Sequence, residues 1–169
     1  ILWILEENST TQNNLINEAE KMGIKRNRLI FADRLPIEKH LSRIKNADLF
    51  LDTYPYNAHT TAKDFLYVGI PILTLKGKTF ASRVAFSLLE NLDLEDDLVT
   101  DNIEEYKKKA IEIATNKQLH SNIKSKIYKN KLKTKLFKTK DYTSNIEKAY
   151  IEVYNRYINN QLPDHIKIS

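Results

Sequence analysis

A short polar stretch of the chain holds the residue types best suited to chemistry. The sequence Asn57-Ala58-His59-Thr60-Thr61 leads from an apolar, strand-like run into a segment with helical patterning. A helix N-terminus offers free N–H groups and the positive end of the helix dipole, so it favours a phosphate group. The hydroxyls of Thr60 and Thr61 can each donate a further hydrogen bond, and His59 can donate one more or supply charge. The stretch therefore predicts an anion site, and the simpler alternative is that Thr60 or Thr61 only caps the helix.

Three other polar residues extend this prediction. Asp64 lies one turn into the same helix, where its carboxylate could accept hydrogen bonds from ribose hydroxyls or could simply be a favourable acid in a first helical turn. His40 and Arg43 stand three residues apart in a second expected helix that begins at Pro36. An imidazole can stack on a nucleobase and a guanidinium can donate to its carbonyl oxygens, although an exposed surface pair would show the same spacing.

The elements that must position these residues alternate along the first 100 residues. Apolar runs of four to six residues alternate with amphipathic stretches of ten to fifteen, which is typical of an α/β fold with a doubly wound parallel sheet. Ligands bind such sheets beyond the carboxyl ends of the strands. The expected strands are Ile1 to Leu5, Arg28 to Phe31, Ala47 to Asp52 and Pro71 to Leu75, and the expected helices run from Thr10 to Met22, from Pro36, from His59–Thr61 to Gly69, and after Gly77.

The C-terminal part is expected to be helical throughout. We expect no strand after Leu98, and Asp101 with Glu104 resembles a capping box that would start a helix ending near Thr115. Tyr150, Tyr154 and Tyr157 recur at helical spacing, which favours packing over ligand binding. The predicted organisation is one structural domain, with a nucleotide-binding lobe at residues 1–100 and C-terminal helices at residues 101–169 packed on it.

The positive charge of the chain belongs to one segment. From Lys107 to Lys140 there are twelve lysines, no arginine and one acid, Glu112, which gives this segment +11 and leaves −6 for the rest of a chain whose net charge is +5. Nucleic-acid binders usually add arginines or aromatic platforms to such charge. We therefore interpret the segment as a solvated lysine face and expect no nucleic-acid partner, with nucleic-acid binding as the alternative.

Composition and motif content exclude several kinds of site and partner. The chain has no cysteine, which removes disulfides and thiolate chemistry and suits a reducing, cytoplasmic compartment. Its longest apolar run, Ile1 to Leu5, is far below the roughly 20 residues of a membrane span, so no membrane partner is expected. No P-loop, glycine-rich dinucleotide motif or clustered Asp and His pattern is present, and neither a metal nor another cofactor is expected. The start at Ile1 suggests a piece of a longer protein.

In their order along the chain, these residues resemble the catalytic region of the nucleocytoplasmic O-linked N-acetylglucosamine transferases. That family consists of glycosyltransferases with a tetratricopeptide array and two Rossmann-like lobes in the GT-B arrangement, and the likeness covers nearly the whole chain. The matching segments are Leu2-Trp3-Ile4-Leu5, Arg28-Leu29-Ile30-Phe31, His40-Leu41-Ser42-Arg43, Ala47 through Thr53, Asn57 through Thr61, Gly69-Ile70-Pro71, Ala81 through Ala85, Leu136-Phe137 and Pro163-Asp164-His165.

The resemblance implies a C-terminal donor-binding lobe for a UDP-sugar, with UDP-N-acetylglucosamine as the expected donor and serine or threonine hydroxyls of proteins as acceptors. It implies that His40 stacks near the uracil, that Arg43 and the backbone at Leu35 contact the base, and that Asp64 contacts the ribose. His59, Thr60 and Thr61 would hold the diphosphate, with His59 as a catalytic residue. Ile37 stands where better-known members carry a lysine that contacts the ribose, and Ala58 replaces a glycine.

Other functions remain open at this stage. The family's first lobe, with much of the acceptor site, and its tetratricopeptide array have no counterpart in these residues, so the chain alone is expected to be inactive. The alternatives are the donor lobe of a GDP-fucose-dependent protein O-fucosyltransferase, which shares the architecture, and a noncatalytic nucleotide-binding or interaction domain.

Overall fold

The computed structural model describes residues 1–168, and these residues divide into two compact units. The first unit comprises Ile1–Arg43 and the second begins at Ile44. Each unit contains its own parallel β-sheet. The division falls inside helix α2 (Ile37–Ile44), one residue before the end of that helix.

The first unit is a strand-helix-strand arrangement. Strands β1 (Leu2–Leu5) and β2 (Leu29–Ala32) pair in parallel, with Leu2 opposite Leu29 and Leu5 opposite Ala32. Helix α1 (Ser9–Lys21) and a short 3-10 turn η1 (Arg26–Arg28) connect them. The side chain of Asn8 caps α1 by accepting from the Thr11 amide at 2.8 Å, and Gly23 follows the helix with φ of 78°, a backbone angle that favours glycine.

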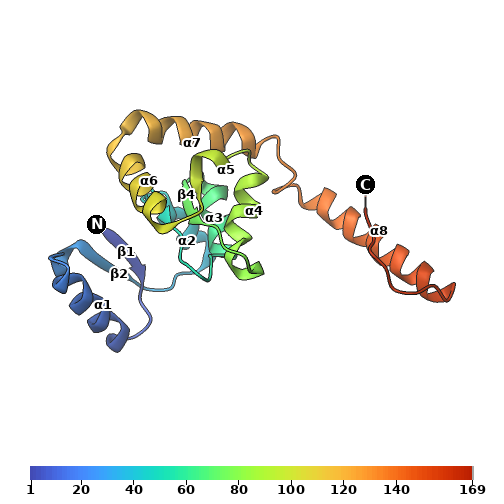
Figure 1. Cartoon of the computed structure of the whole chain (residues 1–169), viewed down its shortest axis with the longest axis horizontal. Helices are drawn as coiled ribbons and strands as arrows, with labels where there is room; N and C mark the ends of the chain where they lie inside the picture. Colours follow the sequence, from blue (N-terminus) through green and yellow to red (C-terminus); the bar gives the residue numbers. More distant parts are fainter. Residues whose placement is uncertain (169) are drawn as a thin grey trace. The chain divides into compact units, whose positions relative to one another are not determined.

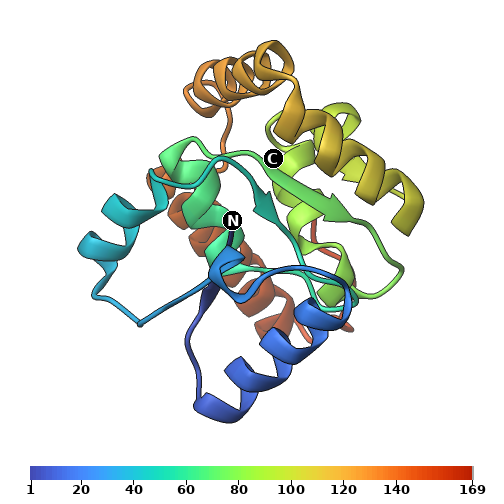
Figure 2. The ribbon, with the colours of Figure 1, turned by 90° about the vertical axis from the view of Figure 1, so that its left-hand side faces the viewer.

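The second unit is built on a three-stranded parallel sheet in the order β3-β4-β5. Its strands are β3 (Phe50–Leu51), β4 (Ile72–Leu75) and β5 (Val99–Thr100), and Figure 2 shows β3 and β4 side by side. Every residue of β4 is buried, as expected of a central strand covered on both faces. Helix α3 (Thr60–Val68) connects β3 to β4 and ends at Gly69, whose φ is 95°.

Helices on either side of β4 complete the core of the second unit (Figure 1). The 3-10 turn η2 (Phe80–Ser82) precedes α4 (Val84–Glu90) and α5 (Glu95–Leu98), and α6 (Ile103–Thr115) follows β5. Helices α3, α4 and α6 all contact β4. The core is formed by apolar side chains from these elements that are at most 2% exposed: Leu66, Ile72, Leu73, Ala85, Leu89, Leu98 and Ile113.

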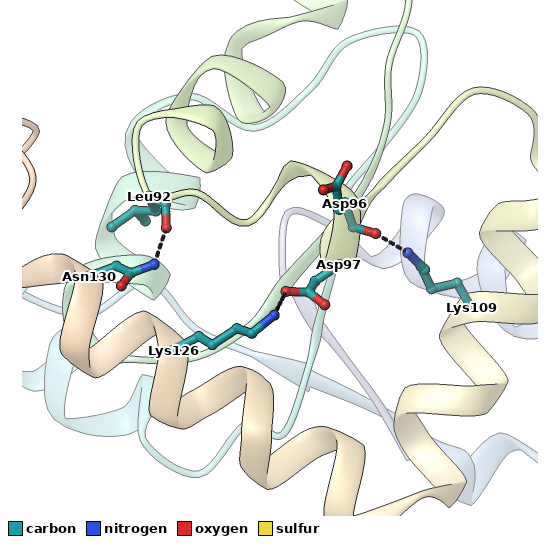
Figure 3. Close-up of polar contacts among 6 residues, drawn as sticks. All are labelled: Leu92, Asp96, Asp97, Lys109, Lys126 and Asn130. Carbon is teal, nitrogen blue, oxygen red and sulfur yellow. Dashed lines mark hydrogen bonds and ion pairs between the residues drawn. The ribbon is translucent and has the colours of Figure 1, made fainter.

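Polar contacts fasten α6 and α7 (Lys117–Lys131) to the segment around α5 (Figure 3). Lys126 Nζ lies 2.6 Å from Asp97 Oδ2, and Asn130 Nδ2 donates to the Leu92 carbonyl at 2.6 Å. From α6, Lys109 Nζ donates to the Asp96 carbonyl at 2.7 Å. Lys109 and Lys126 of the lysine-rich segment therefore have partners in the segment around α5.

The last helix, α8 (Thr139–Ile158), has no buried residue. Tyr150, Tyr154 and Tyr157, which were expected to pack, are 69%, 62% and 77% exposed. The helical periodicity was interpreted correctly, but these three tyrosines are not covered by other described residues. No helix within residues 1–168 is long and apolar enough to cross a membrane.

The expected elements form with four corrections. The strand expected from Ala47 to Asp52 is only the two-residue strand β3, Phe50–Leu51. A fifth strand, β5, follows Leu98, where no strand was expected, because Val99 and Thr100 pair with Thr74 and Leu75 of β4. The cap of α6 is Asn102, whose side chain accepts from the Glu105 amide at 2.9 Å, rather than Asp101. The helix expected after Gly77 begins only at Val84, because η2 occupies the preceding residues.

The α/β class with parallel strands is confirmed. The division into residues 1–100 and 101–169 within one structural domain stays a prediction, and Ser169, its last residue, lies outside the described residues.

Candidate functional site

A closed loop connects β3 to α3 and sets the start of that helix. Asp52 directly follows β3 and is 5% exposed. Its Oδ1 accepts from the amides of Thr53 at 2.9 Å and Ala58 at 2.7 Å, while its Oδ2 accepts from the Thr74 hydroxyl at 2.6 Å. One carboxylate therefore joins both ends of the loop to the central strand β4.

Further hydrogen bonds close the same loop from within. The Thr53 hydroxyl donates to the Tyr56 carbonyl at 2.6 Å, and Asn57 Nδ2 donates to the Thr53 carbonyl at 2.8 Å. The Asn57 amide donates to the Ala81 carbonyl at 2.9 Å, which ties the loop to η2. Gly77 lies so close to this region that a Cβ there would clash with the Ser82 side chain, and the loop residue Tyr54 would be 3.2 Å away.

The N-terminus of α3 presents unpaired donors. The backbone amides of Thr60, Thr61 and Ala62 donate to no acceptor among residues 1–168. The hydroxyls of Thr60 and Thr61 likewise make no hydrogen bond to residues 1–168, and both residues are exposed. Neither threonine caps the helix with its side chain, so the capping alternative does not account for them. This end of the helix can bind an anion through amides and hydroxyls together.

His59 occupies the N-cap position of α3 without a side-chain capping bond. Its ring stacks on Tyr56, with centroids 5.0 Å apart and an interplanar angle of 18°, and meets the edge of Phe80 at 5.8 Å. Its Nε2 is buried and has no hydrogen-bond partner among the described residues. The imidazole is thus positioned between two rings and has one ring nitrogen without a hydrogen-bond partner.

Asp64 lies in α3 with its side chain 12% exposed. The Lys63 ammonium is 3.1 Å from its Oδ1. The carboxylate therefore sits one turn below the helix start, as its spacing predicted, and already has a cation beside it. Its contact with a ribose stays a prediction.

Burial shifts the pKa of two groups around the loop. Desolvation raises the pKa of Asp52 above its usual 3.8, while the hydrogen bonds from Ala58, Thr74 and Thr53 and the charge of His59 act to lower it. Burial and the charge of Asp52 raise the pKa of Tyr106. The Tyr106 hydroxyl donates to the Asp52 carbonyl at 2.9 Å.

The residues expected to contact a base lie in the first unit. Arg43 Nη1 donates to the Asp33 carbonyl at 2.9 Å, and Nη2 lies 3.5 Å from His40 Nδ1. The guanidinium also lies over the Trp3 ring, 4.8 Å from its centroid. His40 and Arg43 are adjacent as the i, i+3 spacing predicted, and Leu35 is 38% exposed. Contacts of the three residues with a base stay a prediction.

Sequence patterns missed several residues that shape this site. Thr74 and Tyr106 follow Asp52 by 22 and 54 positions, and only the fold brings the three residues together. Tyr56 and Phe80 were not identified as neighbours of His59. The position of Asp52, an acid at the carboxyl end of a strand, was the one signal available. Within residues 1–168, no group of three or more His, Asp or Glu side chains could hold a metal ion.

Comparison with known proteins places this arrangement in a family. The profile of Glycosyl transferase family 41 matches residues 1–146. The chain is 31% identical over 167 residues to the probable UDP-N-acetylglucosamine–peptide N-acetylglucosaminyltransferase SEC of Arabidopsis thaliana, covering 99% of this chain and 17% of that protein. It is 30% identical to the UDP-N-acetylglucosamine–peptide N-acetylglucosaminyltransferase of Caenorhabditis elegans, covering 98% of this chain and 14% of that protein.

The fold agrees with a solved structure of the same kind. A mutant of the Thermobaculum terrenum O-GlcNAc transferase superposes with a TM-score of 0.80 at 26% identity, covering 88% of this chain and 29% of that one. The expected resemblance is therefore confirmed, and the chain spans less than a fifth of the length of the two relatives above. This chain belongs to glycosyl transferase family 41.

Proposed function

We propose that this chain binds the nucleoside diphosphate of a UDP-sugar, with UDP-N-acetylglucosamine as the donor. In this proposal it serves as the donor-binding lobe of a transferase that glycosylates serine and threonine hydroxyls of proteins. The names of the two relatives, which give UDP-N-acetylglucosamine as donor and a peptide as acceptor, support this choice of substrates.

One observation carries the proposal: the unpaired donors gathered at the start of α3. The amides of Thr60 to Ala62, two threonine hydroxyls and the unpartnered Nε2 of His59 belong to four consecutive residues. A diphosphate offers many acceptor oxygens and a negative charge that suits the positive end of a helix dipole. A single anionic ligand can therefore satisfy these donors together.

The same donors can stabilise the departure of the diphosphate. As the bond between the sugar and the β-phosphate oxygen breaks, negative charge accumulates on that oxygen. The acceptor hydroxyl oxygen forms the new bond to the sugar, and its proton passes to a base. Donors fixed before the reaction stabilise this charge without reorganising. In this proposal His59 is the catalytic residue that helps to stabilise the leaving diphosphate, and Tyr56 and Phe80 hold its ring in position.

The nucleoside end of the donor is proposed to contact other residues. His40, Arg43 and the backbone of Leu35 would contact the uracil, and Asp64 would contact the ribose. Their chemistry supports these contacts. The Arg43 guanidinium lies over the Trp3 ring, and the Asp64 carboxylate lies near the start of α3.

Calorimetric titration with UDP tests the phosphate site. We expect the intact protein to bind UDP and the double variant Thr60→Ala, Thr61→Ala to lose at least about tenfold in affinity, because each hydrogen bond to a charged group contributes about 1.5 to 3 kcal/mol. The matched variant Thr60→Ser, Thr61→Ser keeps both hydroxyls and should bind like wild type. Unchanged affinity in the alanine variant would remove the threonines from the site.

A further inference from the structure

The Asp52 carboxylate is connected to the phosphate-binding end of α3 through Ala58. Its Oδ1 accepts from the Ala58 amide at 2.7 Å, and α3 begins two residues later at Thr60. The same oxygen accepts from the Thr53 amide at 2.9 Å. Since the first and last residues of the loop share one acceptor atom, the path of the chain into His59 is constrained.

The other side of Asp52 is fastened to the sheet. Its Oδ2 accepts from the Thr74 hydroxyl at 2.6 Å, its amide donates to the Leu73 carbonyl at 2.9 Å, and its carbonyl accepts from Tyr106 at 2.9 Å. Thr74 is fully buried in β4. Asp52 is thus a rigid connection between the central strand and the loop.

A carboxylate is a costly residue for this position unless its acceptors are needed. An ionised carboxylate loses hydration on burial, and its hydrogen-bond partners compensate for only part of that cost. Among the side chains of its size, only aspartate offers two acceptor oxygens, which here serve two amides and one hydroxyl. Its presence at this position is explained if the loop must be held in one conformation.

We propose that Asp52 and Thr74 form a positioning pair that holds the 53–58 loop, and with it the N-terminus of α3, in the conformation that binds the donor diphosphate. This inference rests on the proposed function, because it concerns the same phosphate site. The pair touches no ligand; it acts by removing the need to order the loop when the diphosphate binds, which would otherwise weaken affinity.

The chain offers a matched set of variants for the test. Thr74→Val removes the hydroxyl with little change of shape, and Thr74→Ser restores a hydroxyl. Thr100→Val is the control, since the Thr100 hydroxyl is also buried in the sheet but donates to the Thr74 carbonyl, at 3.1 Å, and does not touch Asp52. Asp52→Asn removes the charge and one of the two acceptor oxygens.

Two readouts on the intact protein decide the matter: hydrogen–deuterium exchange of the peptide covering residues 53–59, and UDP affinity by calorimetry. We expect Thr74→Val and Asp52→Asn to exchange faster in this peptide and to bind UDP about three- to tenfold more weakly. Thr74→Ser and Thr100→Val should resemble wild type in both readouts.

The outcomes separate this inference from the proposed function. Wild-type UDP affinity in both Asp52→Asn and Thr74→Val, or an equal loss in Thr100→Val, overturns the positioning role alone. Failure of the wild-type protein to bind UDP overturns the proposed function and this inference together. If Asp52→Asn does not fold, the comparison of Thr74→Val with Thr74→Ser still tests the positioning role. Only a role of the Thr74 hydroxyl predicts that serine, unlike valine, keeps the wild-type UDP affinity.

Discussion

The imidazole of His59 lies stacked against the ring of Tyr56, with centroids 5.0 Å apart and planes inclined by 18°. Phe80 meets the same imidazole edge-on, with its plane inclined by 84°. Tyr56 precedes His59 by three residues, and Phe80 comes from the turn before α4. Two rings from different loops therefore orient the histidine at the start of α3 before any ligand binds.

Removing the Tyr56 ring should weaken diphosphate binding through His59. Tyr56→Leu is expected to lower UDP affinity about threefold, since an aromatic pair contributes about 0.5 to 1.5 kcal/mol. Tyr56→Phe is the matched control because it keeps the ring, and it should bind like wild type in a calorimetric titration. Equal affinities for the leucine and phenylalanine variants would show that the stack does not orient His59 for binding.

Arg43 should discriminate between nucleobases, whereas Thr60 and Thr61 should not. Arg43→Ala is expected to weaken UDP binding by about tenfold or more and GDP binding much less, because it removes a charge-assisted bond of about 1.5 to 3 kcal/mol to the base. Competition of UDP against GDP and CDP measures this difference. Stronger binding of GDP than UDP by the wild-type protein would favour the GDP-fucose alternative.

The Arg43 experiment needs a structural control, because the guanidinium also bonds the Asp33 carbonyl and covers Trp3. Arg43→Lys keeps the charge but lacks the planar fork of donors, so it should fold like wild type and still lose discrimination. Equal weakening for all three nucleotides, or none, would mean that Arg43 does not contact the base.

The stability of the protein should depend on pH through Asp52. Burial raises the pKa of Asp52 in the folded state, so the folded protein binds this proton more tightly than the unfolded chain does. The contribution of Asp52 to stability is therefore fully present below its unfolded pKa, near 3.8, and is lost as the pH rises through its folded pKa. Asp52→Asn has no such titration, so its stability relative to wild type should increase across this window.

Urea denaturation of wild type and Asp52→Asn at matched pH values, from below about 3.8 to neutral, measures this difference directly. Other titrating groups are shared by both proteins and cancel in the comparison. The unfolding free energy of Asp52→Asn minus that of wild type should rise with pH. If this difference stayed constant or fell, the pKa of Asp52 would not be raised in the folded protein.

The lysine-rich segment should bind nucleic acid only weakly. Lys126 is paired with Asp97 at 2.6 Å, and Lys131 donates to the Tyr67 carbonyl at 2.6 Å while lying over its ring, so some of these side chains have structural contacts. Fluorescence anisotropy with a labelled oligonucleotide should show an affinity that falls steeply between about 50 and 200 mM salt. Tight binding at physiological salt would favour the nucleic-acid alternative.

Local sequence predicted most of the individual elements. Short apolar runs marked β1, β2 and β4 to within one residue, and Gly69 marked the end of α3 because its positive φ disfavours other residues. The i, i+3 spacing of His40 and Arg43 brought them together, as helical geometry requires. The order of motifs predicted the family, which the match over residues 1–146 confirms.

Local sequence patterns could not predict which distant segments pair. Val99 and Thr100 form a strand only because β4 offers them a partner, and a two-residue run has too little apolar periodicity to be recognised. The exposed tyrosines of α8 illustrate the converse, since a correct helical period does not reveal what covers the apolar face.

The donor types at the start of α3 were determined by sequence alone, because they depend on consecutive residues and on the free amides that every helix start possesses. The hydrogen bonds that hold the loop before this helix start were decided by tertiary structure. Asp52 reaches Thr74 and Tyr106 only through the pairing of β3 with β4 and the packing of α6. Hydrogen bonds are short-ranged and directional, so which distant donors meet a given carboxylate depends on the folded positions of whole elements.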